Sequence, residues 1–295
     1  MPSESAPGAP AIAVIVLTWN GRDLTLDCLD SLARVATPGV RVIVVDNASA
    51  DGTAEAIRAR FGADVTVLSN PSNLGYAAGN NAGIERALND GADLILLLNN
   101  DTVVDPAFID ELVRGLAAAP GAGIVGPKTY YASPPDRIWF AGGEVSLWRG
   151  TARHIGIRQT DRGQYDTPRD VDYVSGCALL ARREVFDRIG MLDTAYRAYF
   201  EDTDFCMRAA RAGFRIRYVP AAKVWHRISA STGGQLSRRK ATRKLASAWR
   251  FFRTYARPWH WLTIPLLFVA DVLRVGFLVL AGRIRDNGPP PQSTR

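Results

Sequence analysis

The first 120 residues repeat one pattern four times: a run of apolar residues is followed by a segment with the periodicity of an amphipathic helix. The runs are rich in Val, Ile and Leu without polar alternation, so strands formed from them need cover on both faces. Helices on both sides of a parallel sheet provide that cover. The pattern predicts an α/β fold with a mostly parallel sheet, with strands at residues 11–18, 40–46, 65–70 and 93–98 and helices at residues 23–34, 49–61, 76–90 and 106–119.

The rhythm changes after about residue 123. Strand-like runs at residues 123–131, 137–148 and 171–182 are separated by turn-rich loops, and helices are expected at residues 183–190 and 201–213. Two short strands, 215–220 and 223–226, follow. A chain of 295 residues is long enough for one large domain and an appendage. We therefore expect a disordered leader (1–10), one α/β domain (11–232), a helical appendage that is basic and apolar (237–285) and a disordered tail (286–295).

Charge is distributed unevenly along the chain. The formal net charge is +7, and residues 205–270 contain fourteen Lys and Arg but no Asp or Glu. Such a block predicts a polyanionic partner: a membrane surface, a nucleic acid or a phosphorylated substrate. The three cysteines are widely spaced and form no CxxC pair, so neither a zinc site nor a disulfide framework is indicated. A reducing cytosol is the simplest setting.

Small polar side chains and carboxylates follow all four predicted parallel strands. Ligands of open parallel sheets bind beyond the carboxyl ends of the strands, so these residues are expected to share one edge. Each residue taken alone also suits a helix cap or a turn. Four strand ends together favour a binding site, and its residues are Thr18, Trp19 and Asn20, then Asp46, Asn47, Ser49 and Asp51, then Asn73 and Gly75, and finally Asn99, Asn100 and Asp101.

The absence of two common motifs restricts the classes of ligand that this site is expected to bind. No G-x-G-x-x-G follows the first strand and no P-loop motif occurs, which argues against a dinucleotide fold and a P-loop kinase or ATPase. Asp46 is suited to accept a hydrogen bond from a base N–H, such as the imino group of uracil or thymine. Asp101 is suited to hold a hard divalent cation, because Mg²⁺ and Mn²⁺ often share one or two carboxylates with substrate phosphates.

A second cluster of carboxylates begins the segment 201–226. Glu201, Asp202 and Asp204 fall in the first turn of a predicted helix, where acidic residues also stabilise the helix dipole. A partly desolvated carboxylate beside others has a raised pKa and can act as a general base, and Asp202 is the candidate. His226 closes the segment after a strand; a lone histidine is more often structural, but this position suits a ligand of the same cation.

Six stretches together resemble the family 2 glycosyltransferases, and most of all the rhamnosyltransferase-type members of bacterial cell-wall and surface-polysaccharide pathways. They cover roughly residues 11–232 and include "VIVLTWNGRDLTLDCLDSL", "VIVVDNASADGT", "NLGYAAGNNAGI", "LLLNNDTVVDP", "SGCALLARREVFDRIGMLD" and "YFEDTDFCMRAARAGFRIRYVPAAKVWH". The resemblance implies a GT-A fold with a nucleotide-binding half (11–125) and an acceptor and catalytic half (126–232), a nucleotide-diphospho-sugar donor, Mg²⁺ or Mn²⁺ as cofactor, and inversion at the anomeric carbon.

The resemblance also assigns roles by motif position. The family's DxD-like element falls on residues 99–101, where Asn99 replaces its first carboxylate and leaves Asp101 for the metal. His226 matches a histidine that completes the metal site in related galactofuranosyl transferases. The family's acidic pair is Glu201 and Asp202, with Asp202 as base. The residues expected to bind the donor are Thr18, Trp19, Asn20, Asp46, Asn47, Ser49, Asn73, Gly75, Asn80, Asn99, Asn100 and Gly176.

The partners follow from the same resemblance. dTDP-rhamnose is the first candidate donor and UDP-sugars the alternative, because Asp46 cannot distinguish thymine from uracil. The acceptor is expected to be a hydroxyl of a glycan or a polyprenyl-linked sugar, with no nucleic acid involved. Charged residues and Pro265 interrupt the apolar run at residues 261–282, so we expect its helices to lie on an anionic membrane surface rather than to span it. That places the protein in the cytoplasm, peripheral on the inner face of the cell membrane; packing in a homodimer is the alternative.

Two other classes of protein share some of these sequence features. A nucleotidyltransferase is also α/β with carboxylates and Mg²⁺, but it typically has a Gly-rich basic signature after the first strand, where this chain has "TWNGRD". It would release pyrophosphate instead of a nucleoside diphosphate. A non-catalytic binder of sugars or nucleic acids would use the basic block but gives no reason for the acidic cluster at residues 201–204; its RNA binding would depend steeply on salt.

Overall fold

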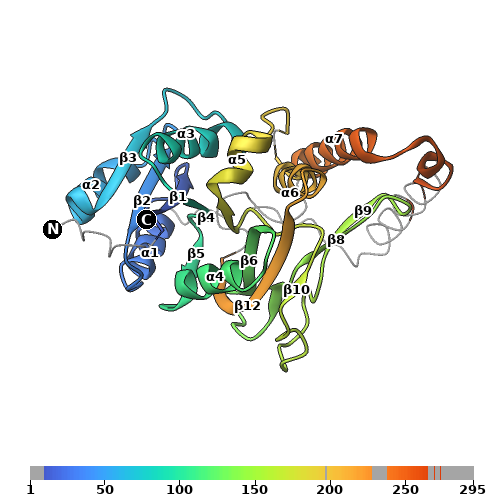
Figure 1. Ribbon diagram of the computed structural model, residues 1–295. Coiled ribbons are helices and arrows are strands. Elements are labelled where there is room, and N and C mark those ends of the chain that lie inside the picture. Colours follow the sequence, from blue (N-terminus) through green and yellow to red (C-terminus); the bar gives the residue numbers. More distant parts are fainter. Residues whose placement is uncertain (1–9, 197, 228–237, 265–268, 270–272, 274–295) are drawn as a thin grey trace. The chain divides into compact units, whose positions relative to one another are not determined.

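A computed structural model describes residues 10–196, 198–227, 238–264, 269 and 273 (Figure 1). The chain divides into two compact units, 1–144 with 154–228, and 145–153 with 229–295. The first unit comprises most of the segment predicted as one α/β domain (11–232), but residues 145–153 belong to the second unit. The elements are β1 (Ile12–Thr18), α1 (Arg22–Leu32), β2 (Val40–Asp46), α2 (Thr53–Phe61), η1 (Gly62–Asp64), β3 (Val65–Ser69), α3 (Tyr76–Asn89), β4 (Leu94–Asn99), β5 (Thr102–Val104), α4 (Phe108–Ala117), β6 (Ala122–Tyr131), β7 (Ile138–Phe140), β8 (Gly143–Ser146), β9 (Thr151–His154), β10 (Arg169–Asp170), β11 (Ala178–Arg182), α5 (Arg183–Ile189), α6 (Glu201–Arg211), β12 (Arg215–His226), α7 (Arg238–Tyr255) and η2 (Pro258–Leu262).

The described strands of the first unit form one mixed sheet in the order β10-β12-β6-β11-β4-β1-β2-β3, with β5 added to β12 and β7 to β6. The four strands predicted from the N-terminal repeats are parallel, and β12 is parallel to β6. Strand β11 lies antiparallel between β4 and β6. The predicted α/β fold with a mostly parallel N-terminal half is confirmed.

The two faces of the sheet carry different helices. Ile12, Val14 and Val16 of β1 share one apolar cluster with Phe108 and Leu112 of α4, and the buried apolar residues of α1 belong to the same cluster. The intervening residues of β1 point the other way, because side chains alternate along a strand. Helix α3 covers that second face. Burial on both faces explains why these strands are almost continuously apolar.

Close approach of α3 to the sheet requires glycine. A Cβ added at Gly79 would lie 2.5 Å from Cδ1 of Leu17, and one added at Gly83 would lie 2.6 Å from Cγ2 of Ile15. Real Cβ contacts are longer than this, so larger residues would push the helix away from the sheet. The small residues within "YAAGNNAGI" therefore set the distance at which the N-terminus of α3 approaches the carboxyl edge of the sheet.

The second half of the domain departs from the expected strands. The single strand expected at residues 137–148 is divided into β7 and β8 around Gly142, whose φ of 102° favours glycine. Of residues 171–182 only Ala178–Arg182 form a strand, which leaves residues 175–177 as a turn where β11 meets β4. The two strands expected at 215–220 and 223–226 form one strand, β12, with an irregularity between Val219 and Lys223.

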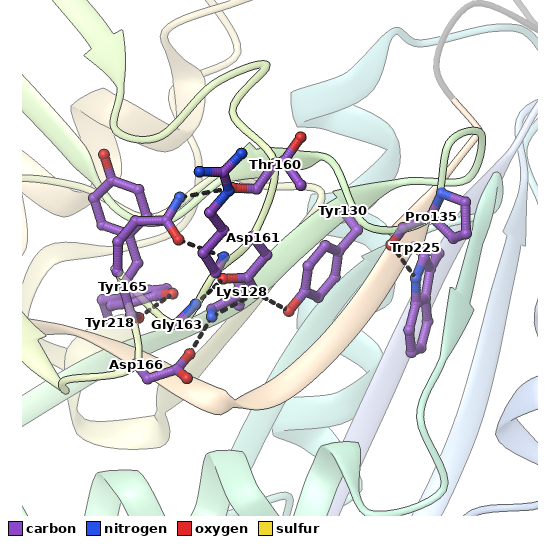
Figure 2. Close-up of polar contacts among 12 residues, drawn as sticks. Lys128, Tyr130, Pro135, Thr160, Asp161, Gly163, Tyr165, Asp166, Tyr218 and Trp225 are labelled. Carbon is purple, nitrogen blue, oxygen red and sulfur yellow. Dashed lines mark hydrogen bonds and ion pairs between the residues drawn. The ribbon is translucent and has the colours of Figure 1, made fainter.

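A buried lysine fixes the long loop between β9 and β10 to the sheet (Figure 2). Nζ of Lys128, on β6, donates to Oδ2 of Asp161 (2.8 Å) and also pairs with Asp166. The hydroxyl of Tyr130 donates to the same oxygen of Asp161 (2.5 Å), and the hydroxyl of Tyr218 donates to the carbonyl of Tyr165 (3.0 Å). Sheet and loop therefore satisfy each other's buried polar groups.

The second unit is built from the turn at residues 145–153 and the described part of the C-terminal region. Helix α7 confirms the basic helix expected from residue 237, and η2 follows it. The hydroxyl of Thr263 donates to the carbonyl of Trp148 (2.6 Å), and the rings of Trp148 and His260 meet edge to face at 4.8 Å. Within the described residues we find no helix long and apolar enough to cross a bilayer. The leader (residues 1–9), the tail and most of residues 265–285 lie outside the described residues.

Candidate active site

The loops that follow β1 and β2 are tied together at the carboxyl edge of the sheet. The N–H of Asn20 donates to Oγ of Ser49 (2.9 Å), and Oδ1 of Asn20 accepts from the N–H of Ala50 (2.7 Å). Asn20 adopts a left-handed conformation (φ 49°), which asparagine tolerates better than most residues. Beside these loops lies a hollow of about 390 Å³, lined by Asn20, Gly21, Arg22, Asp23, Leu24 and Asp51. The first two strand ends thus meet where the sequence predicts the nucleotide.

Asn47 organises the loop after β3. Its Oδ1 accepts from Nδ2 of Asn70 (2.8 Å), and its Nδ2 donates to the carbonyl of Gly75 (3.1 Å) and to Oδ1 of Asn73 (3.3 Å). Oδ1 of Asn73 also accepts from the N–H of Gly75 (2.9 Å). Three predicted donor residues are therefore joined in one network that sets the shape of the loop leading into α3.

Three other predicted donor residues differ in exposure. Asp46 is buried and accepts a hydrogen bond from the N–H of Ser49 (3.2 Å). Trp19 is half exposed (50 %). Asn80 is buried on α3, and its Nδ2 donates to the carbonyl of Tyr76 (3.0 Å). Asp46 and Trp19 lie at the strand ends, whereas the amide of Asn80 bonds within its own helix.

The polar residues after β4 are joined to those after β1. Nδ2 of Asn100 donates to Oγ1 of Thr18 (3.2 Å) and of Thr25 (3.0 Å). The backbone N–H of Asn99 donates to the carbonyl of Cys177 (2.9 Å), which anchors the turn before β11 beside the end of β4. Asn100 therefore orients the end of β4, and Asp101 follows it at the edge of the sheet.

Asp101 and His226 come together although 125 positions separate them in the sequence. Strand β5 pairs with the end of β12, which places Thr102 opposite His226. Nε2 of His226 lies 3.0 Å from Oδ1 of Asp101, and both side chains are about 90 % buried. Oδ1 of Asp101 and Nδ1 of His226 have no hydrogen-bond partner among the described residues.

This pair fits part of a divalent cation site. Two ligand atoms that bind an octahedral cation at about 2.1 Å and at right angles lie about 3.0 Å apart, the distance found between Oδ1 of Asp101 and Nε2 of His226. A carboxylate oxygen suits Mg²⁺ and Mn²⁺, and a neutral imidazole is a common ligand of transition metals. The described residues contain no group of three or more His, Cys, Asp or Glu arranged around one point. The remaining ligands would have to come from a diphosphate and water.

The charge state of His226 depends on its neighbours. Burial lowers the pKa of the imidazole, whereas the adjacent carboxylate of Asp101 raises it. Burial raises the pKa of the Cys177 thiol, which therefore stays protonated. Only the neutral imidazole binds a metal, so cation binding at this point would displace a proton.

Asp202 and Glu201 begin α6 and have different surroundings. Asp202 accepts hydrogen bonds from the N–H of Gly176 at Oδ2 (2.8 Å) and from the N–H (2.6 Å) and hydroxyl (3.2 Å) of Thr203 at Oδ1. Glu201 is buried, and its Oε2 has no hydrogen-bond partner among the described residues. Burial raises the pKa of both groups, that of Glu201 to about 8. Three hydrogen-bond donors stabilise the ionised form of Asp202. The acidic pair therefore carries its negative charge on Asp202 and its proton on Glu201.

The Asp101–His226 pair and the acidic pair both lie near the turn at residues 175–177. The charges of both Asp101 and Asp202 act on the Cys177 thiol and raise its pKa, and both act on the Tyr76 hydroxyl. That hydroxyl donates to the carbonyl of Gly176 (2.7 Å), whose N–H binds Asp202. The turn at Gly176 and Cys177 thus bonds to Asp202 through the N–H of Gly176 and to Asn99, two residues before Asp101, through the carbonyl of Cys177.

Aromatic rings continue from His226 toward Asp202. Trp139, half-buried on β7, meets the rings of His226 (4.7 Å) and His154 (4.6 Å) edge to face. His154 lies 6.1 Å from Tyr173 between ring centroids, and the charge of Asp202 acts on the Tyr173 hydroxyl. The sequence analysis did not predict Trp139, Tyr173, Cys177 or Tyr76, because nothing local marks them.

The third carboxylate of the acidic cluster has a structural role. Asp204 pairs with Arg208 one turn later (2.8 Å) and accepts from the hydroxyl of Tyr196. The same Arg208 donates to the carbonyls of Ile189 and Met191, which fixes the chain between α5 and α6. The ion pair with Arg208 and the hydrogen bond from Tyr196 therefore explain Asp204, whereas Glu201 and Asp202 have no such role among the described residues.

These features define a class of protein. The parallel N-terminal half, the polar strand ends and the carboxylates facing one edge form the GT-A fold of glycosyltransferases. A family model described as glycosyltransferase like family 2 matches residues 9–249. The chain belongs to that family and is a glycosyltransferase, which excludes both a nucleotidyltransferase and a non-catalytic binder.

Curated relatives agree with the family. The N-acetylglucosaminyl-diphospho-decaprenol L-rhamnosyltransferase of Mycobacterium tuberculosis is 30 % identical over 241 residues, 75 % of this chain and 78 % of that protein. The O-antigen biosynthesis protein RfbC of Myxococcus xanthus is 30 % identical over 261 residues, 85 % of this chain but 19 % of that protein. An uncharacterized protein of Sinorhizobium fredii, y4gI, matches with 80 % of this chain and 26 % of its own length.

Solved structures show the same fold at low identity. A mannosyltransferase from Pyrobaculum calidifontis, solved with GDP-Man and Mn²⁺, has a TM-score of 0.57 at 18 % identity and covers 96 % of this chain and 83 % of that chain. Residues 1–349 of TarS from S. aureus, in complex with UDP, have a TM-score of 0.54 at 19 % identity and cover 74 % and 60 %. At these identities the likeness supports the fold alone.

Proposed function

We propose that this glycosyltransferase is a metal-dependent, inverting enzyme that moves L-rhamnose from dTDP-rhamnose to a hydroxyl of a lipid-linked or glycan acceptor in cell-wall or surface-polysaccharide synthesis. The observation that carries the proposal is the meeting of Asp101 and His226 with Asp202 around the turn at residues 175–177. A donor held there would have its leaving group at one carboxylate and its anomeric carbon facing the other.

The nucleotide is assigned to the edge formed by the first two strand ends, beside the hollow that Asn20 and Asp51 line. Asp46 is suited to accept a hydrogen bond from the imino N–H of the base, and Trp19 offers an exposed ring for stacking. Asn20 and Ser49 border the same edge and already hold each other in place. Rigid polar loops lose little entropy on binding, which favours tight and oriented docking of the donor.

The diphosphate is assigned to Asp101 and His226. A divalent cation bound by them would neutralise negative charge that develops on the departing nucleoside diphosphate. Asn99 stands where the family has another carboxylate, so the protein itself supplies few anionic ligands and the donor must supply several. We therefore expect metal and donor to bind together, each raising the affinity for the other.

Asp202 is assigned as the general base. The acceptor oxygen attacks the anomeric carbon from the face opposite the leaving group, the bond to the diphosphate oxygen breaks, and the acceptor proton passes to Asp202. The N–H groups of Gly176 and Thr203 orient the carboxylate. Protonated Glu201 beside it adds no second negative charge, so Asp202 is free to ionise.

The sugar and acceptor are inferred from the relatives. The rhamnosyltransferase from Mycobacterium tuberculosis acts, by its name, on N-acetylglucosaminyl-diphospho-decaprenol, and this chain covers most of its length. The presence of GDP-Man and UDP in the solved structures shows that the fold accepts more than one base. UDP-sugars therefore remain the alternative donors.

A thermal-shift screen tests donor and metal together. The protein is heated with dTDP-rhamnose, UDP-sugars and GDP-mannose, each with and without Mn²⁺ or Mg²⁺, and the right pair should stabilise it by mass action. The selected donor is then incubated with a polyprenyl-diphospho-N-acetylglucosamine acceptor, and nucleoside diphosphate release and product anomeric configuration are measured. If only UDP-sugars stabilise the protein, the donor is a UDP-sugar and not dTDP-rhamnose. If the product retains the anomeric configuration of the donor, Asp202 does not act as the base of an inverting reaction.

A further inference from the structure

Large apolar side chains are exposed at an unusual density in the second unit. Eleven large hydrophobic residues are exposed among the described residues, and seven belong to this small unit. Trp249 is 60 % exposed and Leu262 is 73 % exposed. A folded protein rarely leaves such side chains together in water unless they contact a partner or a membrane. The tryptophan face, defined here as Trp148, Leu245, Trp249, Trp259 and Leu262, therefore requires an occupant.

Helix α7 has one buried stripe of residues and one exposed pair of apolar residues. Ser247, Phe251 and Tyr255 follow one another at helical spacing and are buried. Leu245 and Trp249 form a second pair, four residues apart, which is exposed. Burial of the first stripe accounts for the stability of the helix, so the second stripe is not needed to hold the helix in place.

Ring contacts join the three chain segments that carry this face. The rings of Trp249 on α7 and Trp261 in η2 meet at 5.2 Å. The Trp148 turn is held to His260 by a ring contact at 4.8 Å. The guanidinium of Arg257 lies 5.3 Å from the centre of the Trp259 ring. The face is thus preformed, with its aromatic rings set beside basic groups.

The charge around this face is of one sign. Residues 238–264 contain eight Lys and Arg, and neither this segment nor residues 145–153 contains an Asp or Glu. Arg243, Arg250 and Arg253 are exposed on the same half of α7 as Trp249. Exposed tryptophans flanked by arginines fit the boundary between lipid headgroups and acyl chains. The basic side chains beside these rings favour acidic headgroups as the occupant over a neutral surface.

We propose that the tryptophan face of the second unit docks on an anionic lipid bilayer, with the indole rings at the headgroup level and Arg250 and Arg253 against the acidic headgroups. The helix lies along the surface and does not cross it, in agreement with the absence of a spanning helix in the described part of the chain. This surface is independent of the donor site, so the proposal does not rest on the proposed function.

Vesicle flotation with the full chain, without donor or acceptor, tests the proposal. The lipids are phosphatidylcholine alone or phosphatidylcholine with a minor fraction of phosphatidylglycerol, at low and high salt. We expect binding only to the anionic vesicles and weaker binding at high salt. Leu262→Glu, at a highly exposed position that tolerates a polar residue, is expected to reduce the partition coefficient at least about tenfold on anionic vesicles.

Charge and ring contributions are separated by matched variants. Each basic residue near an anionic surface contributes about fivefold to partitioning, so Arg250→Gln with Arg253→Gln should reduce binding about thirtyfold. The control is Arg34→Gln with Lys223→Gln, which removes the same charge from exposed positions of the first unit and should change binding less than about threefold. Circular dichroism melts of every variant show whether it has folded.

Three results would overturn the proposal. Equal loss of binding in the control pair would mean that net charge, and not this face, attracts the vesicles. Unchanged flotation of folded Leu262→Glu would show that the tryptophan face does not contact lipid. A wild-type dimer in sedimentation without lipid that becomes monomeric in Leu262→Glu would assign the face to a second copy of the chain.

Discussion

Replacement of Glu201 by glutamine tests whether the acidic pair holds one charge or two. Glu201 is 8 % exposed and its pKa is raised to about 8 by burial and by the charge of Asp202. In the unfolded chain a glutamate has a pKa of about 4.3. At a pH between these two pKa values, Glu201 is ionised in the unfolded chain and protonated in the folded protein. Folding therefore takes up a proton throughout this range.

The sign of the effect follows from that uptake. A group whose pKa is higher in the folded state contributes stability that is fully present below the unfolded pKa and is lost as the pH rises through the folded pKa. Each pH unit in the window changes the free energy of unfolding by about 1.4 kcal/mol, so wild type loses about 3 kcal/mol between pH 5 and pH 7 through this residue. Glutamine has the shape of the protonated acid and does not titrate.

Urea denaturation of Glu201→Gln and wild type at both pH values measures this difference. We subtract the free energy of unfolding of wild type from that of the variant at each pH. This difference should be about 3 kcal/mol larger at pH 7 than at pH 5. Glu55→Gln, on the exposed side of α2, controls for the removal of a negative charge. If the stability difference between Glu201→Gln and wild type were the same at both pH values, Glu201 would be ionised in the folded protein and the assignment of a single charge would be wrong.

Four further perturbations follow from the site and the core. Asp202→Asn should keep donor binding in thermal shift and lower kcat by about 10²- to 10⁴-fold, and near-normal turnover would contradict its role as base. Asp101→Ala should abolish the extra stabilisation that Mn²⁺ gives with donor, measured by thermal shift; an unchanged Mn²⁺ effect would place the cation elsewhere. A Cβ at Gly176 would lie 2.7 Å from the Tyr76 hydroxyl, so Gly176→Ala should reduce turnover and Tyr76→Phe should partly restore it, whereas no rescue would locate the clash elsewhere. Lys128→Met removes the buried ammonium group that pairs with Asp161 and Asp166 and should reduce the free energy of unfolding by about 2 kcal/mol in urea denaturation, and no loss would mean that water replaces the lysine.

Some predicted site residues serve the architecture of the site more directly than its chemistry. The side chains of Asn47 and Asn100 bond to neighbouring loops, and Asp204 pairs with Arg208. From the sequence alone these residues look the same as Asp46 or Asp101, because carboxylates and amides at strand ends suit both ligands and turns. Which role applies depends on whether a neighbouring donor or acceptor is in reach, and that is a tertiary property.

The amino-acid sequence by itself determined the strand and helix pattern of the N-terminal half, the polar strand ends and the basic character of the C-terminal helix. These features follow from local periodicity, backbone sterics and charge, which act over a few residues. Only the tertiary structure decided that β11 inserts between β4 and β6, that the turn at Gly176 and Cys177 bonds to both Asp202 and Asn99, and that Lys128 meets Asp161. Such meetings depend on strand order and on the burial of groups far apart in the chain, and no local pattern records either.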